Sequence, residues 1–351
     1  MNQSPTQTST APAPLIWRDD HLAVLDQRLL PSEVSYLQAV NAAQTAQAIR
    51  DLAVRGAPAI GIAAAYGLTL EARLLAAAGH DLTRSTLEPA LTVLAQARPT
   101  AVNLGWALQR MARLLDQPGL EWPDLLAEAG RIHQEERDSN AAMARIGADF
   151  IRPGSRVLTI CNTGALATGG SGTAYAVIVE AWRRGHLVEA FAAETRPWFQ
   201  GTRLTTWELA QAGVRHRLLV DSAVPWLLKT QAIDWVISGA DRVVANGDTA
   251  NKIGTYAAAL AARAHGAKMM VVAPFSTLDE ATPNGDAIPI EERPADEVTA
   301  PGGRALAPAG TAVWNPVFDV TPAELVDVLV TERGAIEHPD RERLSAWWPT
   351  T

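Results

Sequence analysis

Four short apolar runs in the second half of the sequence each end on a residue that can do chemistry. The runs are "RVLTI", "AFAA", "HRLLV" and "WVISGA", and the residues that follow them are Cys161, Glu194, Asp221 and Asp241. A carboxyl group buried behind apolar residues keeps its proton to a higher pH and can act as an acid. A thiol near a helix N-terminus ionises more readily and can act as a base.

These four endings are more informative together than singly. Asp and Ser at the end of a strand commonly cap the next helix, so each ending alone has a structural explanation. In an open α/β sheet, however, ligands bind at the carboxyl ends of the strands. Four polar endings in succession, one of them carrying the only thiol of the chain, therefore predict a site at one edge of a sheet.

The stretch after Cys161, "NTGALATGGSGTAY", is rich in glycine between an expected strand and an expected helix. Glycines let backbone N–H groups approach an anion, and the helix dipole adds a favourable field. The P-loop motif fails because Gly170 stands where its lysine is required, and the dinucleotide fingerprint fails at Tyr175. We expect an anion-binding loop of another kind, without a nucleotide.

Cationic residues recur where helices are expected to begin. Arg55 precedes Pro58, Arg98 precedes Pro99, and Lys252 stands in "TANKIGTY". A guanidinium beside exposed backbone amides is a good cradle for a phosphate dianion. A single Arg is exposed by default, but three such places, two in the first half and one in the second, predict a phosphate held between them.

The elements that must position these residues fall into two groups. Residues 1–13 are expected to form a disordered tail, and residues 14–130 a mainly helical domain opened by a short β-hairpin, in which "SEVSYLQAVNAAQTAQAIRDLAVRG" has helical periodicity. In residues 131–351, β-branched runs alternate with Ala-rich stretches, which favours right-handed βαβ units and a parallel sheet. The predicted class is α/β: a small all-α N-terminal domain with that hairpin, then a Rossmann-like parallel-sheet domain.

Composition excludes several classes of protein. The 351 residues carry a net charge of −8, which argues against a nucleic-acid-binding surface. A single cysteine permits neither an intramolecular disulfide nor a Cys-based zinc site, and the seven His residues show no ligand spacing, so we expect no metal and no cofactor. The start lacks a signal-peptide pattern, and the uncharged run of residues 56–70 is short for a membrane span. We expect a cytoplasmic protein that binds neither nucleic acid nor membrane.

Several longer motifs resemble one family in their order along the chain. They are "LDQRLLP", "AVRGAPAIGIAAAYG", "ARPTAVNLGWAL", "CNTGALATGG", "ETRPWFQGTRLTTWEL", "SGADRVVANGDTANKIGTY" and "PVFDVTP". This set resembles the methylthioribose-1-phosphate isomerases, the aldose–ketose isomerases of methionine salvage. Their superfamily also contains the regulatory subunits of translation initiation factor 2B, but "NTGALAT", "ETRPWFQG" and "GADRVVANGDTANKIGT" are similar to the isomerases.

The resemblance implies a role for each matching residue. Cys161 would be the catalytic thiol and Asp241 the catalytic acid. The substrate, a small sugar phosphate, would be bound by Arg55, Gly56, Ala57, Arg98, Gln200, Asn251 and Lys252. The resemblance also implies a homodimer formed through the C-terminal domain. Gly105 in "NLGWAL" replaces a larger residue of the family pattern, which we expect to affect packing only.

The implied reaction converts 5-methylthio-D-ribose 1-phosphate into 5-methylthio-D-ribulose 1-phosphate. Because the phosphate ester blocks the anomeric oxygen, the ring oxygen must be protonated for the ring to open, and a buried Asp241 suits this task. Cys161 would act as the base at C2, or would stabilise a direct hydride shift from C2 to C1. Trp198 is a candidate to pack on the methylthio group.

Other readings are compatible with parts of the pattern. A related phosphopentose, such as ribose 1,5-bisphosphate or 5-deoxyribose 1-phosphate, would be the nearest alternative substrate. A regulatory protein like the initiation-factor subunits would need no chemistry, and the joint presence of Cys161 and Asp241 argues against it. A nicotinamide dehydrogenase is disfavoured by the broken fingerprint.

Overall fold

The computed structural model describes residues 12–99 and 101–348. An antiparallel sheet of order β1-β2-β3 opens the chain and comprises β1 (Leu15–Trp17), β2 (Leu22–Leu25) and β3 (Tyr36–Ala39). The predicted hairpin is therefore longer by one strand, and the helical interpretation of "SEVSYLQAV" was wrong. Tyr36 pairs with Leu25 and Ala39 with Leu22, so this stretch completes an edge of β2 that a helix would leave without hydrogen bonds.

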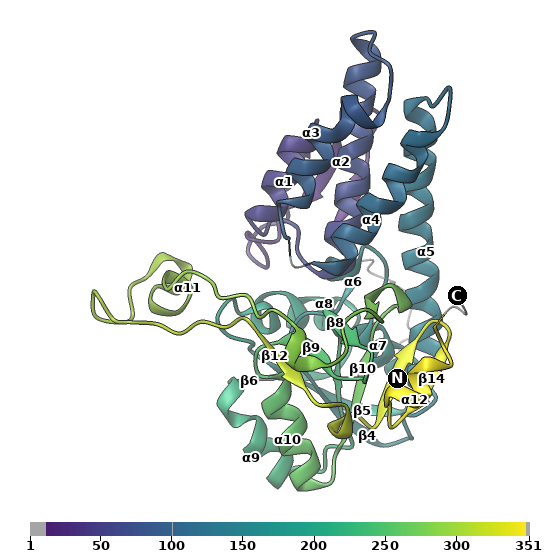
Figure 1. The fold of residues 1–351 in the computed structure, drawn as a ribbon. Coiled ribbons are helices and arrows are strands. Elements are labelled where there is room, and N and C mark those ends of the chain that lie inside the picture. Colours follow the sequence, from purple (N-terminus) through teal and green to yellow (C-terminus); the bar gives the residue numbers. More distant parts are fainter. Residues whose placement is uncertain (1–11, 100, 349–351) are drawn as a thin grey trace, which may run out of the picture.

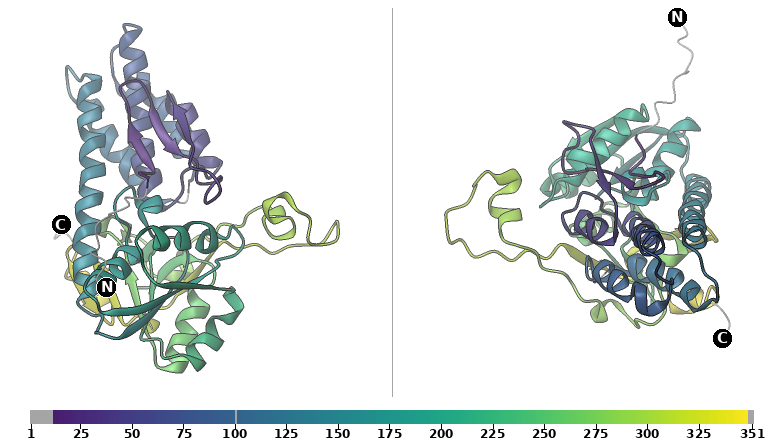
Figure 2. Two further views of the ribbon diagram at one scale, coloured as in Figure 1. Left: turned by 180° about the vertical axis from the view of Figure 1, so that it is seen from behind. Right: turned by 90° about the horizontal axis from the view of Figure 1, so that it is seen from above.

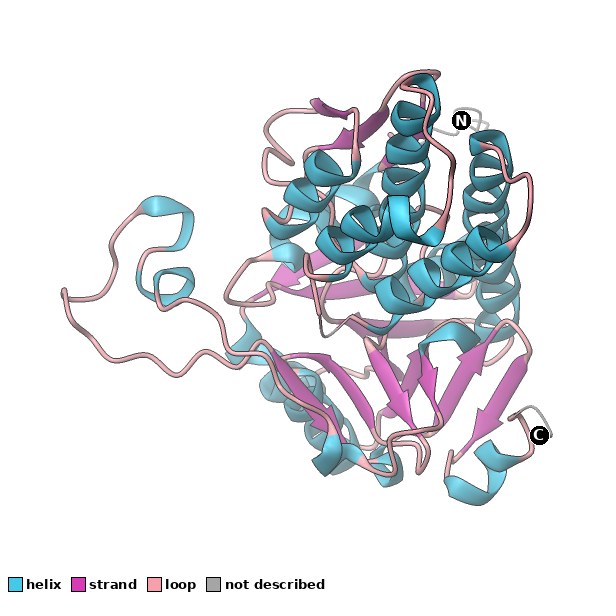
Figure 3. Ribbon diagram, turned by 45° about the horizontal axis from the view of Figure 1, so that its top comes forward, coloured by secondary structure: helices cyan, strands magenta, loops and turns pink. Residues whose placement is uncertain are grey.

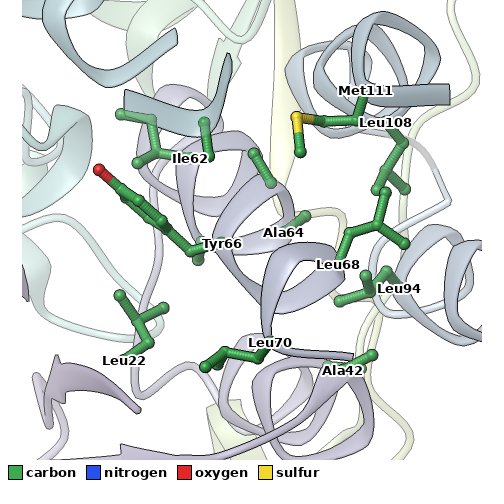
Figure 4. Packing of buried hydrophobic residues seen from close by; sticks show 14 of the residues in the cluster. Leu22, Ala42, Ile62, Ala64, Tyr66, Leu68, Leu70, Leu94, Leu108 and Met111 are labelled. Carbon is green, nitrogen blue, oxygen red and sulfur yellow. The ribbon is translucent and has the colours of Figure 1, made fainter. Parts of the chain in front are cut away.

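Helices dominate the rest of the N-terminal half (Figure 1). They are α1 (Ala42–Arg50), α2 (Ala57–Ala77), α3 (Arg84–Ala95), α4 (Val102–Ala112), the 3₁₀ turn η1 (Arg113–Asp116) and α5 (Trp122–Ala148). Helix α2 is the centre of this core, where Ile62, Leu68 and Leu70 are buried (Figure 4). Gly61 lies so close to α4 that an added Cβ would stand 2.8 Å from a backbone oxygen there.

Helix α2 is apolar on nearly every face, and its charged residues are Glu71 and Arg73. Among the described residues it is the one helix long and apolar enough to cross a membrane by length and composition, yet 72% of its most apolar stretch is buried inside the protein. A helix that is hydrophobic on every face is expected in the core of a large protein. We therefore interpret α2 as a core helix.

The second half of the chain is built on a sheet of order β14-β13-β10-β7-β4-β5-β6, parallel except for β14. Its strands are β4 (Ser155–Thr159), β5 (Leu187–Ala193), β6 (His216–Leu219), β7 (Trp235–Ser238), β10 (Lys268–Val272), β13 (Val328–Thr331) and β14 (Gly334–Glu337). The predicted α/β class and parallel sheet are confirmed.

Helices cover both faces of this sheet (Figure 3). Helix α5 and α7 pack on one face through Met143 and Val177, and α9 and α10 pack on the other through Leu228 and Ala259. The helices and helical turns of this half are α6 (Ala165–Thr168), α7 (Ala174–Arg183), the π-helical turn η2 (Gly201–Thr205), α8 (Thr206–Gln211), η3 (Asp221–Ala223), α9 (Val224–Thr230), α10 (Thr255–His265), η4 (Phe275–Thr277), η7 (Ala323–Leu325) and α12 (Arg341–Ser345).

A smaller sheet of order β11-β8-β9-β12 adjoins the main one. It comprises β8 (Arg242–Val244), β9 (Thr249–Lys252), β11 (Leu278–Asp279) and β12 (Phe318–Thr321). Between β11 and β12 the chain forms an extended arm whose ends pack on the body, where the Gly285 N–H donates to Asp248 (2.9 Å), and whose middle part stands away from it (Figures 1 to 3). The arm, residues 280–317, carries η5 (Gly285–Ala287), α11 (Asp296–Thr299) and η6 (Pro301–Gly303).

The predicted boundary between residues 130 and 131 falls inside α5, which packs against α2 in the first half and α7 in the second. A continuous helix thus joins the two halves, as expected for the segment "PDLLAEAGRIHQEERDSNAAMARIGADFI". The division into residues 14–130 and 131–351 stays a prediction. Most of the predicted tail, residues 1–13, lies outside the described residues.

Candidate active site

The four strands with polar endings are neighbours in the order β6-β5-β4-β7 and run parallel. Their carboxyl ends therefore lie at one edge of the sheet, as the sequence predicted. Asp221 has a structural task there, because its carboxylate accepts hydrogen bonds from the backbone N–H groups of Thr195 (2.8 Å) and Arg196 (2.7 Å). The endings at Cys161 and Asp241 instead line a pocket.

This pocket, here called the central pocket, has a volume of about 490 Å³. Its lining contains the predicted residues Arg55, Gly56, Arg98, Cys161, Gln200, Asp241 and Lys252, together with Leu52, Pro197, Trp198, Arg293 and Phe318. Ala57 lines an adjoining cavity that shares Gly56, Arg98 and Asp241 with the central pocket. Asn251 is buried beside Lys252 on β9 and donates a hydrogen bond to Thr255 (3.0 Å), so it stands behind the lining.

The Cys161 thiol is held in a defined direction. Its backbone has a φ of +68°, a left-handed conformation that is costly for a residue with a Cβ and is maintained by the surroundings. The Cys161 N–H donates to Thr195 Oγ1 (2.9 Å), and its carbonyl accepts from Thr205 Oγ1 (2.7 Å). Gln200 Nε2 lies 3.6 Å and Arg55 Nη2 3.9 Å from Sγ. Two N–H donors, one amide and one guanidinium, are thus directed at the sulfur.

Asp241 follows β7 and is partly buried between the pocket and the sheet. Burial raises the pKa of this carboxyl above its ordinary value, because desolvation disfavours the charged form. The cationic side chains of Lys252, Arg55, Arg98 and Arg293 act in the opposite direction. The net rise means that Asp241 keeps its proton to a higher pH than a solvated carboxyl, as a proton donor must.

Cationic side chains gather around Cys161 and Asp241 in the lining of the central pocket. Arg55, Arg98, Lys252 and Arg293 all line the central pocket, and the amino terminus of α2 begins there with Gly56 and Ala57. The Lys252 ammonium lies 4.2 Å from the centre of the Phe318 ring. Burial lowers the pKa of Arg98, which pairs with Glu291 (3.2 Å). Several cations and a helix N-terminus in one enclosed place suit a phosphate dianion.

Binding of phosphate is expected to weaken above pH 8. Burial, with a smaller contribution from neighbouring Arg293, lowers the pKa of Lys252 to about 8, so this ammonium loses its charge as the pH rises through that value. The Kd for inorganic phosphate, measured by titration calorimetry, should then increase by up to about tenfold per pH unit. Lys252→Met should bind more weakly and show no such dependence. A parent Kd that stays constant from pH 7 to 9.5 would refute this assignment.

Gly56 is required by its backbone and by its neighbour. Its φ is +96°, and an added Cβ would lie 2.2 Å from the carbonyl oxygen of Ala167. Gly56→Ala is therefore expected to lower the free energy of unfolding by about 3 kcal/mol in urea titrations. Gly105→Ala is the matched control, because nothing lies within 4 Å of its Cβ position in α4. That variant should gain up to about 1 kcal/mol from helix propensity, whereas an equal loss in both would contradict the argument.

Two sequence interpretations need correction. Lys252 does not begin a helix, because it lies on β9, whose residues pair with β12 so that Lys252 faces Phe318 and α10 starts only at Thr255. The glycine-rich loop does not line the central pocket either. The Gly172 N–H donates to Asn140 Oδ1 (2.8 Å), and the Gly169 carbonyl lies 2.8 Å from His133 Nε2, so α5 anchors the loop.

Arg293 and Phe318 are pocket residues that sequence reasoning missed. Arg293 lies on the arm and forms an ion pair with Glu291 (2.8 Å). Phe318 reaches Lys252 through the register of β9 and β12. Phe318 belongs to the motif "PVFDVTP", but no local chemical signal marks it or Arg293 as a pocket residue, because both arrive from a segment far along the chain.

Trp198 lines the central pocket, as its proposed contact with a methylthio group requires. It also packs against a buried cluster that includes Leu25 and Leu166, and the Arg203 guanidinium lies 4.2 Å from its ring centre. The thioether contact stays a prediction. Across the described ranges, no three His, Cys, Asp or Glu side chains are grouped so that they could hold a metal ion.

Comparison with known proteins supports the resemblance to the isomerases that the motifs indicated. The sequence model of the Initiation factor 2 subunit family matches residues 53–338. The chain is 55% identical over 323 residues to the methylthioribose-1-phosphate isomerase of Alkalilimnicola ehrlichii, covering 92% of this chain and 93% of that protein. The crystal structure of 5-methylthioribose 1-phosphate isomerase from Pyrococcus horikoshii OT3 matches with a TM-score of 0.88 at 37% identity, over 98% of both chains.

A protein of the initiation-factor branch is also similar in structure. The translation initiation factor eIF-2B subunit delta from A. fulgidus matches with a TM-score of 0.79 at 37% identity, over 93% of this chain and 96% of that chain. Identity above 50% to curated isomerases over nearly the full length distinguishes the two branches. This chain therefore belongs to the Initiation factor 2 subunit family and, within it, to the methylthioribose-1-phosphate isomerases.

Proposed function

We propose that this protein is the aldose–ketose isomerase that converts 5-methylthio-D-ribose 1-phosphate into 5-methylthio-D-ribulose 1-phosphate in methionine salvage. The observation that carries the proposal is that Cys161 and Asp241 line one pocket together with four cationic side chains, which suit a phosphate. The names of relatives with more than 50% identity support the substrate. The residue roles are part of the proposal: Cys161 and Asp241 catalyse, and the substrate is bound by Arg55, Gly56, Ala57, Arg98, Gln200, Asn251 and Lys252.

The reaction begins at the ring oxygen. The protonated carboxyl of Asp241 donates its proton to this oxygen, and the bond between it and C1 breaks, which leaves positive charge at C1. The cations of the pocket hold the phosphate and do not take part in bond changes. The hydrogen on C2 must then reach C1, and the C2 hydroxyl must lose its proton to the carboxylate of Asp241. The product is a ketone at C2, and no electrons are gained or lost overall, so the balance requires no redox cofactor.

Two routes move the hydrogen from C2 to C1. In the first, the Cys161 thiolate removes a proton from C2 to give an enol phosphate, and the thiol returns a proton to C1. In the second, the hydrogen passes to C1 with its electron pair while Cys161 stabilises the charge. In deuterium oxide the first route incorporates solvent deuterium at C1 and the second does not, so NMR of the product distinguishes them.

Incubation with 5-methylthioribose 1-phosphate, without added metal or nucleotide, tests the proposal directly. We expect the ketose signal to appear in the NMR spectrum with the parent protein. No turnover of this compound, but turnover of 5-deoxyribose 1-phosphate or ribose 1,5-bisphosphate, would assign a related isomerase. Failure with all three substrates would favour a regulatory protein like the initiation-factor branch.

We also propose that the protein is a cytoplasmic homodimer. The arm bears Trp314 and Leu306, which are 79% and 65% exposed, and an apolar surface of this kind on a projecting segment suits contact with a second copy (Figure 2). Sedimentation equilibrium should give twice the chain mass of 37.5 kDa. A mass equal to one chain at micromolar concentration would contradict the dimer.

A further inference from the structure

Glu208 is a buried carboxylate outside the predicted set of site residues. It lies on α8, is 0% exposed, and forms no ion pair with a Lys or Arg among the described residues. Its Oε2 accepts a hydrogen bond from Asn162 Nδ2 (2.6 Å), and its Oε1 accepts one from the Leu166 N–H (3.2 Å). An added Cβ on Gly164 would lie 2.1 Å from Oε2, so the glycine of "NTG" makes room for this carboxylate.

Asn162 connects Glu208 with the central pocket. Its Nδ2 group also lies 3.4 Å from Thr205 Oγ1, which donates its own hydrogen to the Cys161 carbonyl (2.7 Å). The amide oxygen of Asn162 points the other way and accepts from Arg55 Nη1 (2.8 Å). The second nitrogen of this guanidinium, Nη2, lies 3.3 Å from the Asn162 carbonyl and 3.9 Å from Cys161 Sγ.

The orientation of the Asn162 side-chain amide follows from the charge on Glu208. Both carboxylate oxygens face N–H donors, so the ionised carboxylate is satisfied, whereas a proton on either oxygen would point at a donor. The ionised carboxylate therefore requires the amino side of the Asn162 amide to face it. The oxygen side is then left for Arg55.

We propose that ionised Glu208 is a positioning residue, which orients the Asn162 amide and thereby holds the Arg55 guanidinium between the Cys161 thiol and the phosphate of the substrate. The position of the phosphate beside Arg55 rests on the proposed function. The position of Arg55 beside Cys161 does not, because it follows from contacts within the protein.

The positioning should depend on pH near neutrality. Burial raises the pKa of Glu208 to about 7, against the hydrogen bonds from Asn162 and Leu166. The charged or titratable groups that face it are the Arg55 guanidinium and Tyr175, whose hydroxyl donates to the Glu208 carbonyl (2.9 Å). Below pH 7 Glu208 gains a proton and, like a Gln side chain, offers one good acceptor oxygen to two N–H donors, so the support of Arg55 through Asn162 weakens as the pH falls from 8 to 6.

Alkylation of Cys161 by iodoacetamide tests the proposal without any turnover. Cys161 is the only cysteine of the chain, so the total rate of thiol loss reports on this one side chain. A neighbouring cation favours the reactive thiolate, and Arg55→Met should therefore slow alkylation. Glu208→Gln keeps the size of the side chain but offers one acceptor to two donors, so it should slow alkylation at pH 8 to a similar degree, about tenfold.

Glu136→Gln is the matched control. Glu136 is another buried carboxyl with a pKa raised to about 8, and its Oε1 accepts from Asn140 Nδ2 (2.7 Å), which a Gln oxygen can also do. This variant should be alkylated at the parent rate. In the parent, the alkylation rate should fall below pH 7 more steeply than in Glu208→Gln, because only the parent has the Glu208 proton to gain.

Two outcomes would overturn the proposal. One is a Glu208→Gln protein that is alkylated at the parent rate while Arg55→Met is slow. The other outcome applies if Glu208→Gln does not fold. It is an Asn162→Ala protein whose Cys161 is alkylated at the parent rate, since this variant removes the amide that connects Glu208 with Arg55. With substrate, Glu208→Gln should raise KM about tenfold, because Arg55 holds the phosphate less firmly, and should lower kcat by up to about tenfold, because the Cys161 thiol is less reactive. If the parent shows no turnover, the proposed function fails while the alkylation result still decides the role of Glu208.

Discussion

Replacing Asp241 with Asn should lower kcat by about three orders of magnitude, because general acid catalysis of this kind contributes 10²- to 10⁴-fold. The amide has the shape of the carboxyl group but cannot transfer a proton to the ring oxygen. KM should stay within about threefold of the parent value, because the lost effect belongs to the transition state. Steady-state kinetics with 5-methylthioribose 1-phosphate, followed by NMR, measure both constants.

Asp319→Asn is the control for the Asp241 variant. Asp319 is also a carboxyl whose pKa is raised by burial, to about 6, and it lies on β12 outside the lining of the central pocket. Its Oδ2 accepts from the N–H groups of Gly254 (2.7 Å) and Tyr256 (3.2 Å), which the oxygen of Asn can also do. This variant should keep the parent kcat. Equal losses in both variants would show that the effect at Asp241 is structural.

The pH dependence of kcat should follow Asp241 as well. Since the carboxyl must be protonated to act as the acid, activity should fall as the pH rises through its raised pKa. Asp241→Asn has no such proton to lose, so its residual activity should not show this decline. A decline of equal steepness in Asp241→Asn would assign it to another group.

Replacing Cys161 with Ser should have a similarly large effect on kcat, about 10³-fold. A hydroxyl does not ionise near neutral pH, so it supplies neither a base at C2 nor a polarisable charge beside C1. The thiol lies close to Gln200 Nε2 (3.6 Å), and a hydroxyl can keep a polar contact there, so the pocket should retain its shape. Substrate affinity, measured by calorimetry on the inactive variant, should stay within about threefold of the parent KM.

Cys161→Ala separates the two explanations of such a loss. If Cys161 takes part in the chemistry, both variants should be equally slow while their unfolding temperatures stay near that of the parent. If Cys161 is a buried small residue without a chemical role, Ala should support turnover. A Cys161→Ala protein with more than a tenth of the parent kcat would contradict the proposed role and would leave the hydrogen transfer to Asp241.

The strand-end chemistry could be predicted from the sequence because it depends on a topological rule. Alternating apolar runs and helical stretches predict a parallel sheet, and the carboxyl ends of parallel strands share one edge. Cys161 and Asp241 could thus be placed at one site although 80 residues separate them, and β4 and β7 are indeed neighbours. The start of α2 after Gly56 was equally accessible, because Pro58 in its first turn is a local signal.

Other features depend on contacts that leave no local pattern. Because β9 pairs with β12, Lys252 is a strand residue and does not begin a helix as expected. The same pairing places Phe318 beside Lys252. The same applies to Arg293, which enters the pocket from the arm, and to Glu208, which reaches Asn162 from another helix. Periodicity and capping are properties of consecutive residues, so sequence alone could predict them. The pairing of Lys252 with Phe318, 66 positions apart, and the burial of a charge arise only when distant segments pack together, so these parts of the site required the folded structure.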